Sequence, residues 1–187
     1  MIIIGITGTL GAGKGTIVEY LVAEKHFAHY SVRSFLLDEI RRRGLPENRD
    51  SMYRLANELR AQHGASYVTD QLYRQALQSG RNCVIESIRT TGEVESLRKN
   101  PGFVLLAVDA DPLTRYHRIV ERNSETDRIS FETFLENENR EMKSNDPSRQ
   151  NLRACIRMAD RLLDNNGSRG ELLAQVEKVL KEIVPTG

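Results

Sequence analysis

A glycine-rich segment near the start of the chain constrains the fold more than any other feature. It reads Gly8, Thr9, Leu10, Gly11, Ala12, Gly13, Lys14, Gly15 and Thr16. The preceding residues 2–7 form a short apolar run rich in β-branched side chains, which predicts a buried strand. In the following residues 14–25 the apolar positions have helical spacing. A strand that enters a helix through such a loop directs successive backbone N–H groups and the positive end of the helix at one anion.

The loop predicts ATP and Mg²⁺ as ligands, because Lys14 adds a point charge for the β and γ oxygens of a triphosphate. In the strict form of this pattern a hydroxyl residue follows the lysine directly. Here Gly15 takes that place and Thr16 comes next, so the magnesium contact of Thr16 is expected to shift or to run through water. The loop alone does not distinguish phosphate transfer from hydrolysis.

Apolar runs and helical patterns alternate along the rest of the chain. Further strands are expected at residues 26–31, 83–85, 103–108 and 159–163. This alternation predicts an α/β fold in which helices cover both faces of a parallel sheet. We therefore expect the 187 residues to form a single domain, a three-layer sandwich with a five-stranded parallel sheet and the P-loop NTPase fold.

The composition argues against several kinds of partner. The formal net charge is +1, which gives no global field toward nucleic acid or an anionic membrane. No apolar run approaches the length of a membrane span. Cys83 and Cys155 lack metal spacing and are expected to be free thiols, so cytoplasm is the default location. Only six of the 27 cationic residues are lysine, which fits phosphate binding and codon bias equally well.

Several segments together resemble the nucleoside monophosphate kinases, the relatives of adenylate kinase. The glycine loop looks like theirs, and residues 86–90 resemble their acid-to-arginine segment after the third strand, with glutamate for aspartate and one residue fewer. Residues 118–122 are similar to the arginine pair that opens their lid. Residues 159–160 and 164–168 resemble the segment of dephospho-coenzyme A kinases that passes near the adenine of ATP, which implicates Asn166 and Gly167.

The resemblance implies roles for five arginines around the two substrates, where most of them would neutralise phosphate charge. Arg89 would hold the acceptor phosphate, and Arg118 would lie against the nucleotide base. Arg122 would reach the transferring phosphate. Arg128 and Arg140 would close down with a helical lid over residues 122–146. For each of them the alternative is a surface arginine in an ordinary ion pair.

One acid should organise the magnesium ion together with Thr16. Glu86 follows an apolar strand on the ligand side of the predicted sheet, where a carboxylate would orient the metal's waters. A salt-bridged acid at a strand end is the alternative reading. Asp109 and Asp111 end the next strand and compete for the same role, although Asp111 also suits a helix cap.

The acceptor should bind between helices expected within residues 31–80, near Ser31, Arg33 and Arg89. Many adenylate kinases read the acceptor base with a glutamine where this chain has Glu93, which would accept hydrogen bonds from an exocyclic amine or a ring N–H. Glu93 is also the third residue of a capping box opened by Thr90, which explains it without a ligand.

Three functions remain open. A nucleoside or deoxynucleoside monophosphate as acceptor needs no general base, and the place after the second strand where dephospho-coenzyme A kinases keep an aspartate has no acid. Dephospho-coenzyme A or another hydroxyl acceptor would need a carboxylate, and Glu86 could substitute. A regulatory P-loop ATPase would hydrolyse ATP regardless of acceptor. The oligomeric state is not predicted.

Overall fold

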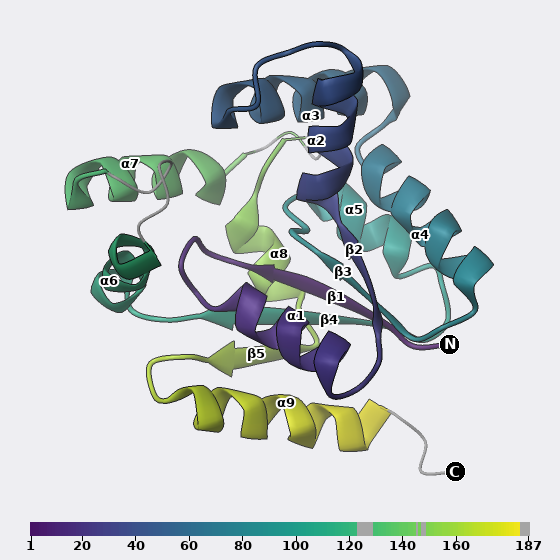
Figure 1. The fold of residues 1–187 in the computed structure, drawn as a ribbon, viewed down its shortest axis with the longest axis vertical. Coiled ribbons are helices and arrows are strands. Elements are labelled where there is room, and N and C mark those ends of the chain that lie inside the picture. Colours follow the sequence, from purple (N-terminus) through teal and green to yellow (C-terminus); the bar gives the residue numbers. More distant parts are fainter. Residues whose placement is uncertain (123–128, 145, 147–148, 184–187) are drawn as a thin grey trace.

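The computed structural model describes residues 1–122, 129–144, 146 and 149–183. Its centre is a five-stranded, all-parallel sheet with strand order β2-β3-β1-β4-β5, and helices lie on both sides of it (Figure 1). The strands are β1 (Ile3–Gly8), β2 (Ala28–Ser31), β3 (Cys83–Glu86), β4 (Phe103–Asp109) and β5 (Arg161–Asp164). The predicted fold class is confirmed.

Alternation along the strands divides the core between the two faces of the sheet. Ile3, Ile85 and Leu105 pack in one cluster, while their chain neighbours Ile4 and Leu106 pack in the other. The first cluster includes apolar residues of α2 (Val32–Arg42), α3 (Arg49–His63), α4 (Tyr67–Ser79), α5 (Thr91–Leu97) and α8 (Leu152–Met158). The second includes those of α1 (Lys14–Ala23) and α9 (Arg169–Ile183). Continuous apolar strands are therefore buried from both sides, as in other parallel sheets.

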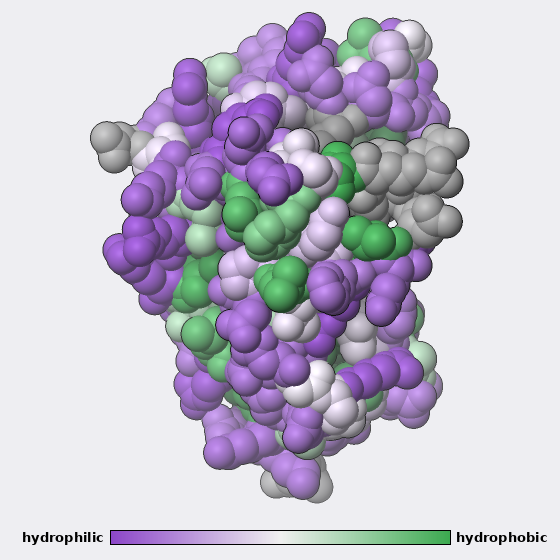
Figure 2. All heavy atoms as spheres, turned by 90° about the vertical axis from the view of Figure 1, so that its left-hand side faces the viewer, coloured by the Kyte–Doolittle hydropathy of each residue, from purple (hydrophilic) through white to green (hydrophobic). Residues whose placement is uncertain are grey.

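Two more helices, α6 (Pro112–Arg122) and α7 (Phe131–Met142), lie beyond the carboxyl ends of the strands (Figure 1). Seen from that side, the surface is mostly hydrophilic, with hydrophobic residues in small groups near its middle (Figure 2). Leu113 and Val120 of α6 are among the exposed large apolar residues. No helix in the described part of the chain is both long and apolar enough to cross a membrane.

Local sequence signals correctly predicted where several helices begin. The capping box of Thr90 and Glu93 opens α5, and Ser168 and Glu171 make the reciprocal bonds at the start of α9. The sequence signals gave no element between residues 147 and 158, where the structure has α8, and they began the last strand two residues early. A helix of seven residues is too short for its period to show, and α8 is held by burial of Leu152 and Cys155.

Candidate active site

The glycine loop is packed tightly against the elements around it. Gly11 has φ 78°, and a Cβ there would lie 2.5 Å from the carbonyl oxygen of Arg115. Gly13 has φ 103°, and its Cβ would lie 2.3 Å from Nδ2 of Asn165. Both positions need glycine for the left-handed backbone and for the close approach. The loop therefore owes its shape to α6 and to the turn after β5 as well as to its own sequence.

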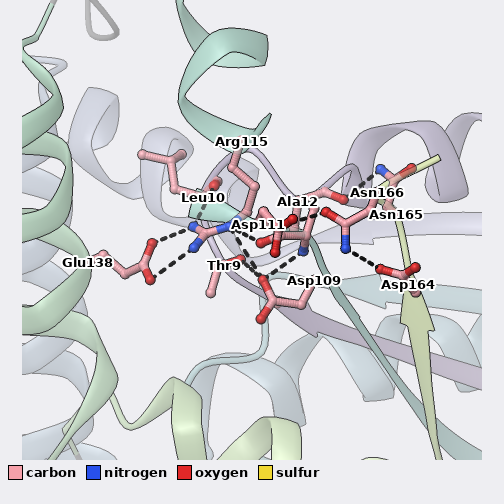
Figure 3. Close-up of polar contacts among 12 residues, drawn as sticks. Thr9, Leu10, Ala12, Asp109, Asp111, Arg115, Glu138, Asp164, Asn165 and Asn166 are labelled. Carbon is pink, nitrogen blue, oxygen red and sulfur yellow. Dashed lines mark hydrogen bonds and ion pairs between the residues drawn. The ribbon is translucent and has the colours of Figure 1, made fainter. Parts of the chain in front are cut away.

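Side chains beside the loop complete this support (Figure 3). The hydroxyl of Thr9 donates to Oδ1 of Asp109 at 2.6 Å, and Nδ2 of Asn165 donates to the carbonyl oxygen of Ala12 at 2.8 Å. Oδ1 of Asp109 also accepts the backbone N–H of Ala110 at 2.9 Å. Asp109, which competed with Glu86 for the metal, is thus used in bracing the loop.

Arg115 is a central residue of this support that the sequence analysis did not identify. Its side chain is 2% exposed. It donates through Nε to the carbonyl oxygen of Ala110 at 2.7 Å, through Nη1 to that of Leu10 at 3.2 Å, and through both terminal nitrogens to Glu138 of α7. Its guanidinium also lies over the ring of Phe134. Arg115 precedes Ile119 by four residues, so the two side chains lie on the same face of α6, and both are buried. This spacing was the sequence signal that could have placed Arg115 on the inner face.

Lys14 folds back over the loop. Its Nζ donates to the carbonyl oxygens of Gly8 at 2.8 Å and Thr9 at 2.7 Å. Burial, reinforced by the positive charge of Arg89, lowers the pKa of Lys14 from 10.5 to about 7, although Glu141 and Glu86 act in the opposite direction. An anion delivered to this position would gain an ammonium group in a low-dielectric, cationic setting.

A cleft of about 780 Å³ starts at the loop and reaches the helices α2 and α3. It brings together most of the predicted site residues from elements that are far apart in sequence. Predicted residues on its wall are Leu10, Gly11, Ala12, Gly13, Lys14, Gly15, Thr16, Arg33, Glu86, Arg89, Arg118 and Arg122. Predicted residues that do not line it are Gly8, Ser31, Glu93, Arg140, Asn166 and Gly167. Arg128 lies outside the described residues.

Arginines stand between the two ends of the cleft. Arg89 is paired with Glu141 of α7, and its Nη1 lies 3.5 Å from Oε1 of Gln150. Nη1 of Arg118 is buried and has no hydrogen-bond partner within the described ranges. Arg122 is exposed at the end of α6. The site therefore offers cationic groups where an anion can be gripped.

Glu86 reaches the cleft from the end of β3, behind the loop. A hydrogen bond from His29, whose Nε2 lies 3.3 Å from Oε1 of Glu86, and a second one from Ser31 hold the pKa of this carboxyl below its usual value against the opposing effect of burial. Ser31 also caps α2, since its hydroxyl accepts the N–H of Ser34 at 3.2 Å. Ser31 thus contributes to the site by holding Glu86 ionised rather than by facing the cleft.

The predicted base-reading role of Glu93 does not fit its surroundings. Glu93 is fully buried. Its Oε2 accepts the N–H groups of Arg89 at 2.8 Å and Thr90 at 3.0 Å, and its Oε1 accepts Nη2 of Arg60 at 3.2 Å. The capping box, offered as the alternative explanation, is the role that the structure shows.

The remaining predicted residues lie away from the cleft. Oδ1 of Asn166 accepts the N–H of Asp111 at 2.7 Å, and Asn166 borders a separate cavity of about 480 Å³. Gly167 lies beside Glu171 of α9. Arg140 is exposed on α7, on a different side of the helix from Glu138 and Glu141. The neighbouring Asn165, which braces the loop, is the residue of this turn that the sequence analysis missed.

The fold and the loop define the class of the protein. A parallel sheet whose central strand enters a helix through an anion-binding glycine loop is that of a P-loop NTPase. The chain belongs to the family described as AAA domain, whose profile matches residues 4–146, and to the UPF0200 proteins. The UPF0200 protein of Methanococcus vannielii is 30% identical over 98% of this chain and 97% of its own length.

Solved structures with a similar fold include several kinases. TT1252 from Thermus thermophilus superposes with a TM-score of 0.63 at 20% identity over 98% of both chains. A putative kinase from Chloroflexus aurantiacus gives 0.58 at 19% identity, over 98% of this chain and 97% of that one. Shikimate kinase from Aquifex aeolicus gives 0.54 at 13% identity over 100% of both chains. At such identities the likeness shows the fold alone, which is that of the P-loop kinases.

Proposed function

We propose that this protein transfers the γ-phosphate of ATP to a nucleoside or deoxynucleoside monophosphate. The observation that carries the proposal is the single cleft that joins the glycine loop to the α2 and α3 helices, with Arg89, Arg118 and Arg122 on its wall. Phosphoryl transfer needs two anions held in line and their charge neutralised. A cleft with a triphosphate site at one end and cations in between supports that chemistry.

The residues at the donor end fit ATP with Mg²⁺. The loop N–H groups, the N-terminus of α1 and Lys14 would hold the phosphates, with Arg118 beside the base. No group of three or more acidic, histidine or cysteine side chains in the described ranges makes a metal site of its own. Thr16 and Glu86 would suffice, because Mg²⁺ commonly binds through one or two protein oxygens, phosphates and waters. When bound, the ion would neutralise charge on the phosphate oxygens.

At the acceptor end Arg89 would hold the acceptor phosphate, with Arg33 of α2 on the same wall and Ser31, the N-cap of α2, behind it. Arg122 would neutralise the transferring group, and Arg128 and Arg140 would join it when a lid over residues 122–146 closes. Arg89 is paired with Glu141, and it must leave this carboxylate before it binds the acceptor. The acceptor phosphate then takes the place of the carboxylate at the guanidinium. This exchange supports a phosphate-bearing acceptor.

The state of Glu86 supports a phosphate acceptor over a hydroxyl acceptor. A hydroxyl group needs a base that takes its proton, as in dephospho-coenzyme A kinase. The pKa of Glu86 is held low, mainly by the hydrogen bond from His29, and this makes the carboxylate a weak base but a good partner for metal-bound water. The reaction is proposed to occur in the cytoplasm, in keeping with two free, buried cysteines.

The test is a measurement of ADP release from ATP and Mg²⁺ with nucleoside and deoxynucleoside monophosphates, dephospho-coenzyme A, shikimate, gluconate or no acceptor. ADP release should depend on a monophosphate, and Lys14→Ala should lose at least about a thousandfold in turnover. Lys25→Ala, just beyond the C-terminal end of α1 and paired with Glu177, is the matched control. Equal hydrolysis without any acceptor would instead indicate a regulatory ATPase.

A further inference from the structure

The acceptor end of the cleft contains a buried arginine with unused hydrogen-bond donors. Arg60 of α3 is 3% exposed and lines the cleft. Nη2 donates to Oε1 of Glu93 at 3.2 Å, whereas Nε and Nη1 are buried and have no hydrogen-bond partner in residues 1–122, 129–144, 146 and 149–183. Buried donors are almost always paired, because losing water without gaining a partner is unfavourable. These two nitrogens therefore indicate a missing acceptor.

Glu93, the neighbouring acid, does not supply that acceptor. Among the described residues Glu93 is the one acid paired with Arg60, and its other oxygen already accepts the backbone N–H groups of Arg89 and Thr90. Turning Glu93 toward Arg60 would break the capping box of α5. The partner for Nε and Nη1 is then expected from a molecule that enters the cleft.

The α2 and α3 wall of the cleft, to which Arg60 belongs, is largely apolar. Besides Arg60 and Arg33 it consists of Val32, Leu36, Met52, Tyr53 and Ala56. Val32, Leu36 and Ala56 are buried. Such a wall fits the faces of a flat heteroaromatic ring and leaves the hydroxyl groups of a polyol without partners. A planar, apolar body with one hydrogen-bond acceptor at its edge matches this part of the cleft.

We propose that Arg60 determines which nucleobase the acceptor carries, selecting bases with an exocyclic oxygen at purine C6 or pyrimidine C4 (guanine, uracil, thymine) over bases with an exocyclic amine at that position (adenine, cytosine). This proposal rests on the proposed function. An exocyclic oxygen accepts a hydrogen bond from Arg60, whereas an amine faces it with a second donor and leaves both groups unpaired. Both nitrogens of Arg60 are shielded, so the base reaches them as the α2 and α3 side chains part around it.

The first experiment compares kcat/KM for GMP, UMP and dTMP with that for AMP and CMP, with ATP as donor. We expect the oxygen-bearing bases to be preferred by roughly tenfold or more, the size of an effect expected for one hydrogen bond to a charged group. Equal values, or a preference for AMP or CMP, would overturn the assignment of Arg60.

The second experiment changes Arg60 itself. Arg60→Gln combined with Glu93→Gln keeps an amide pair in place of the ion pair and an oxygen for the Thr90 N–H, and it should reduce the preference to within about threefold. Arg60→Lys replaces the double variant if the latter does not fold. It keeps a cation beside Glu93 with fewer donors, and it should weaken the preference. Arg54→Gln is the matched control, because Arg54 lies on the same helix, is paired with Asp50 and does not line the cleft. A preference of undiminished size in either Arg60 variant would contradict the proposal.

The acceptor panel separates this inference from the proposed function. Use of dephospho-coenzyme A, shikimate or gluconate with no use of any monophosphate would refute the proposed function and this inference with it. Use of monophosphates without discrimination between oxygen and amine would refute only the role of Arg60.

Discussion

Two buried arginines, Arg115 in contact with the glycine loop and Arg60 on the wall of the cleft, differ in how many of their guanidinium nitrogens have a hydrogen-bond partner. Arg115, 2% exposed, supports the glycine loop, and every nitrogen of its guanidinium donates to a protein oxygen. Arg60, 3% exposed, lies at the acceptor end and uses one nitrogen of three. A saturated cation is part of the scaffold, while an unsaturated one is available to a ligand.

Under the proposed function, this difference follows from what each end would bind. Triphosphates are the same in every P-loop kinase, so the donor end can be built as a fixed loop whose polar groups are satisfied in advance. The acceptor end must distinguish one small molecule from another, and unpaired buried groups give such discrimination because the wrong molecule leaves them unpaired.

The largest expected effect is on stability, and it tests the contrast directly. Arg115→Met leaves Glu138 without its cation and should lower the free energy of unfolding by about 3–5 kcal/mol. Arg60→Met should lower it by roughly 1–3 kcal/mol, because two of the lost nitrogens were unpaired and Glu93 keeps its backbone partners. Urea denaturation measures both. If the Arg60 variant lost as much as the Arg115 variant, the two arginines would not differ as described.

The next effect concerns transfer. Arg89→Ala should reduce kcat/KM for the acceptor by roughly a hundredfold to a thousandfold while the Kd for ATP stays within about threefold. The physical reason is that Arg89 stands between the ends of the cleft and meets only the second anion. Steady-state kinetics and isothermal titration of ATP separate the two quantities, with Arg81→Ala, which bonds His26 elsewhere, as control. A loss of ATP binding would place Arg89 at the donor end.

A smaller effect distinguishes two glycines of the loop. Gly13→Ala should lower stability by roughly 2 kcal/mol, because alanine is strained at φ 103° and its Cβ would displace Asn165. Gly15→Ala should raise stability by about 0.5–1 kcal/mol, since Gly15 is helical and nothing lies within 4 Å of the added Cβ. Thermal unfolding of the two variants provides the comparison. Equal losses would show that the loop is not braced by the turn after β5.

The smallest effect is a pH dependence of nucleotide affinity. The pKa of Lys14 is about 7 in the unliganded protein, mainly because of burial and then because of Arg89. A bound triphosphate favours the ammonium form and raises that pKa, so binding takes up a proton above pH 7. ATP affinity should then fall by up to about tenfold per pH unit above pH 7.5, where phosphate oxygens no longer titrate.

Titration calorimetry in buffers of different ionisation enthalpy measures this proton uptake. Lys14→Met should bind more weakly and lose the pH dependence. An affinity of the unmodified protein that stays constant from pH 7.5 to 9.5 would mean that Lys14 is already charged throughout.

The amino-acid sequence determined the parts of this protein that depend on near neighbours. The five strands, the glycine loop and the capping box at Thr90 are encoded within a few residues of each other, because strand alternation, backbone turns and caps are short-range effects. The same short-range signals missed α8, whose Leu152 and Cys155 are buried and whose Cys155 packs in a core built largely by other elements.

Tertiary structure alone decided which polar side chains are scaffold and which are free to act. Arg115 bonds to Leu10, 105 residues away, and Glu93 to Arg60, 33 residues away. No local pattern distinguishes such a buried guanidinium from a surface arginine, because its partners are brought together only when the sheet and its helices pack. The sequence therefore predicted the glycine loop as a candidate phosphate site, whereas Arg60, the proposed determinant of the acceptor base, became visible only in the folded chain.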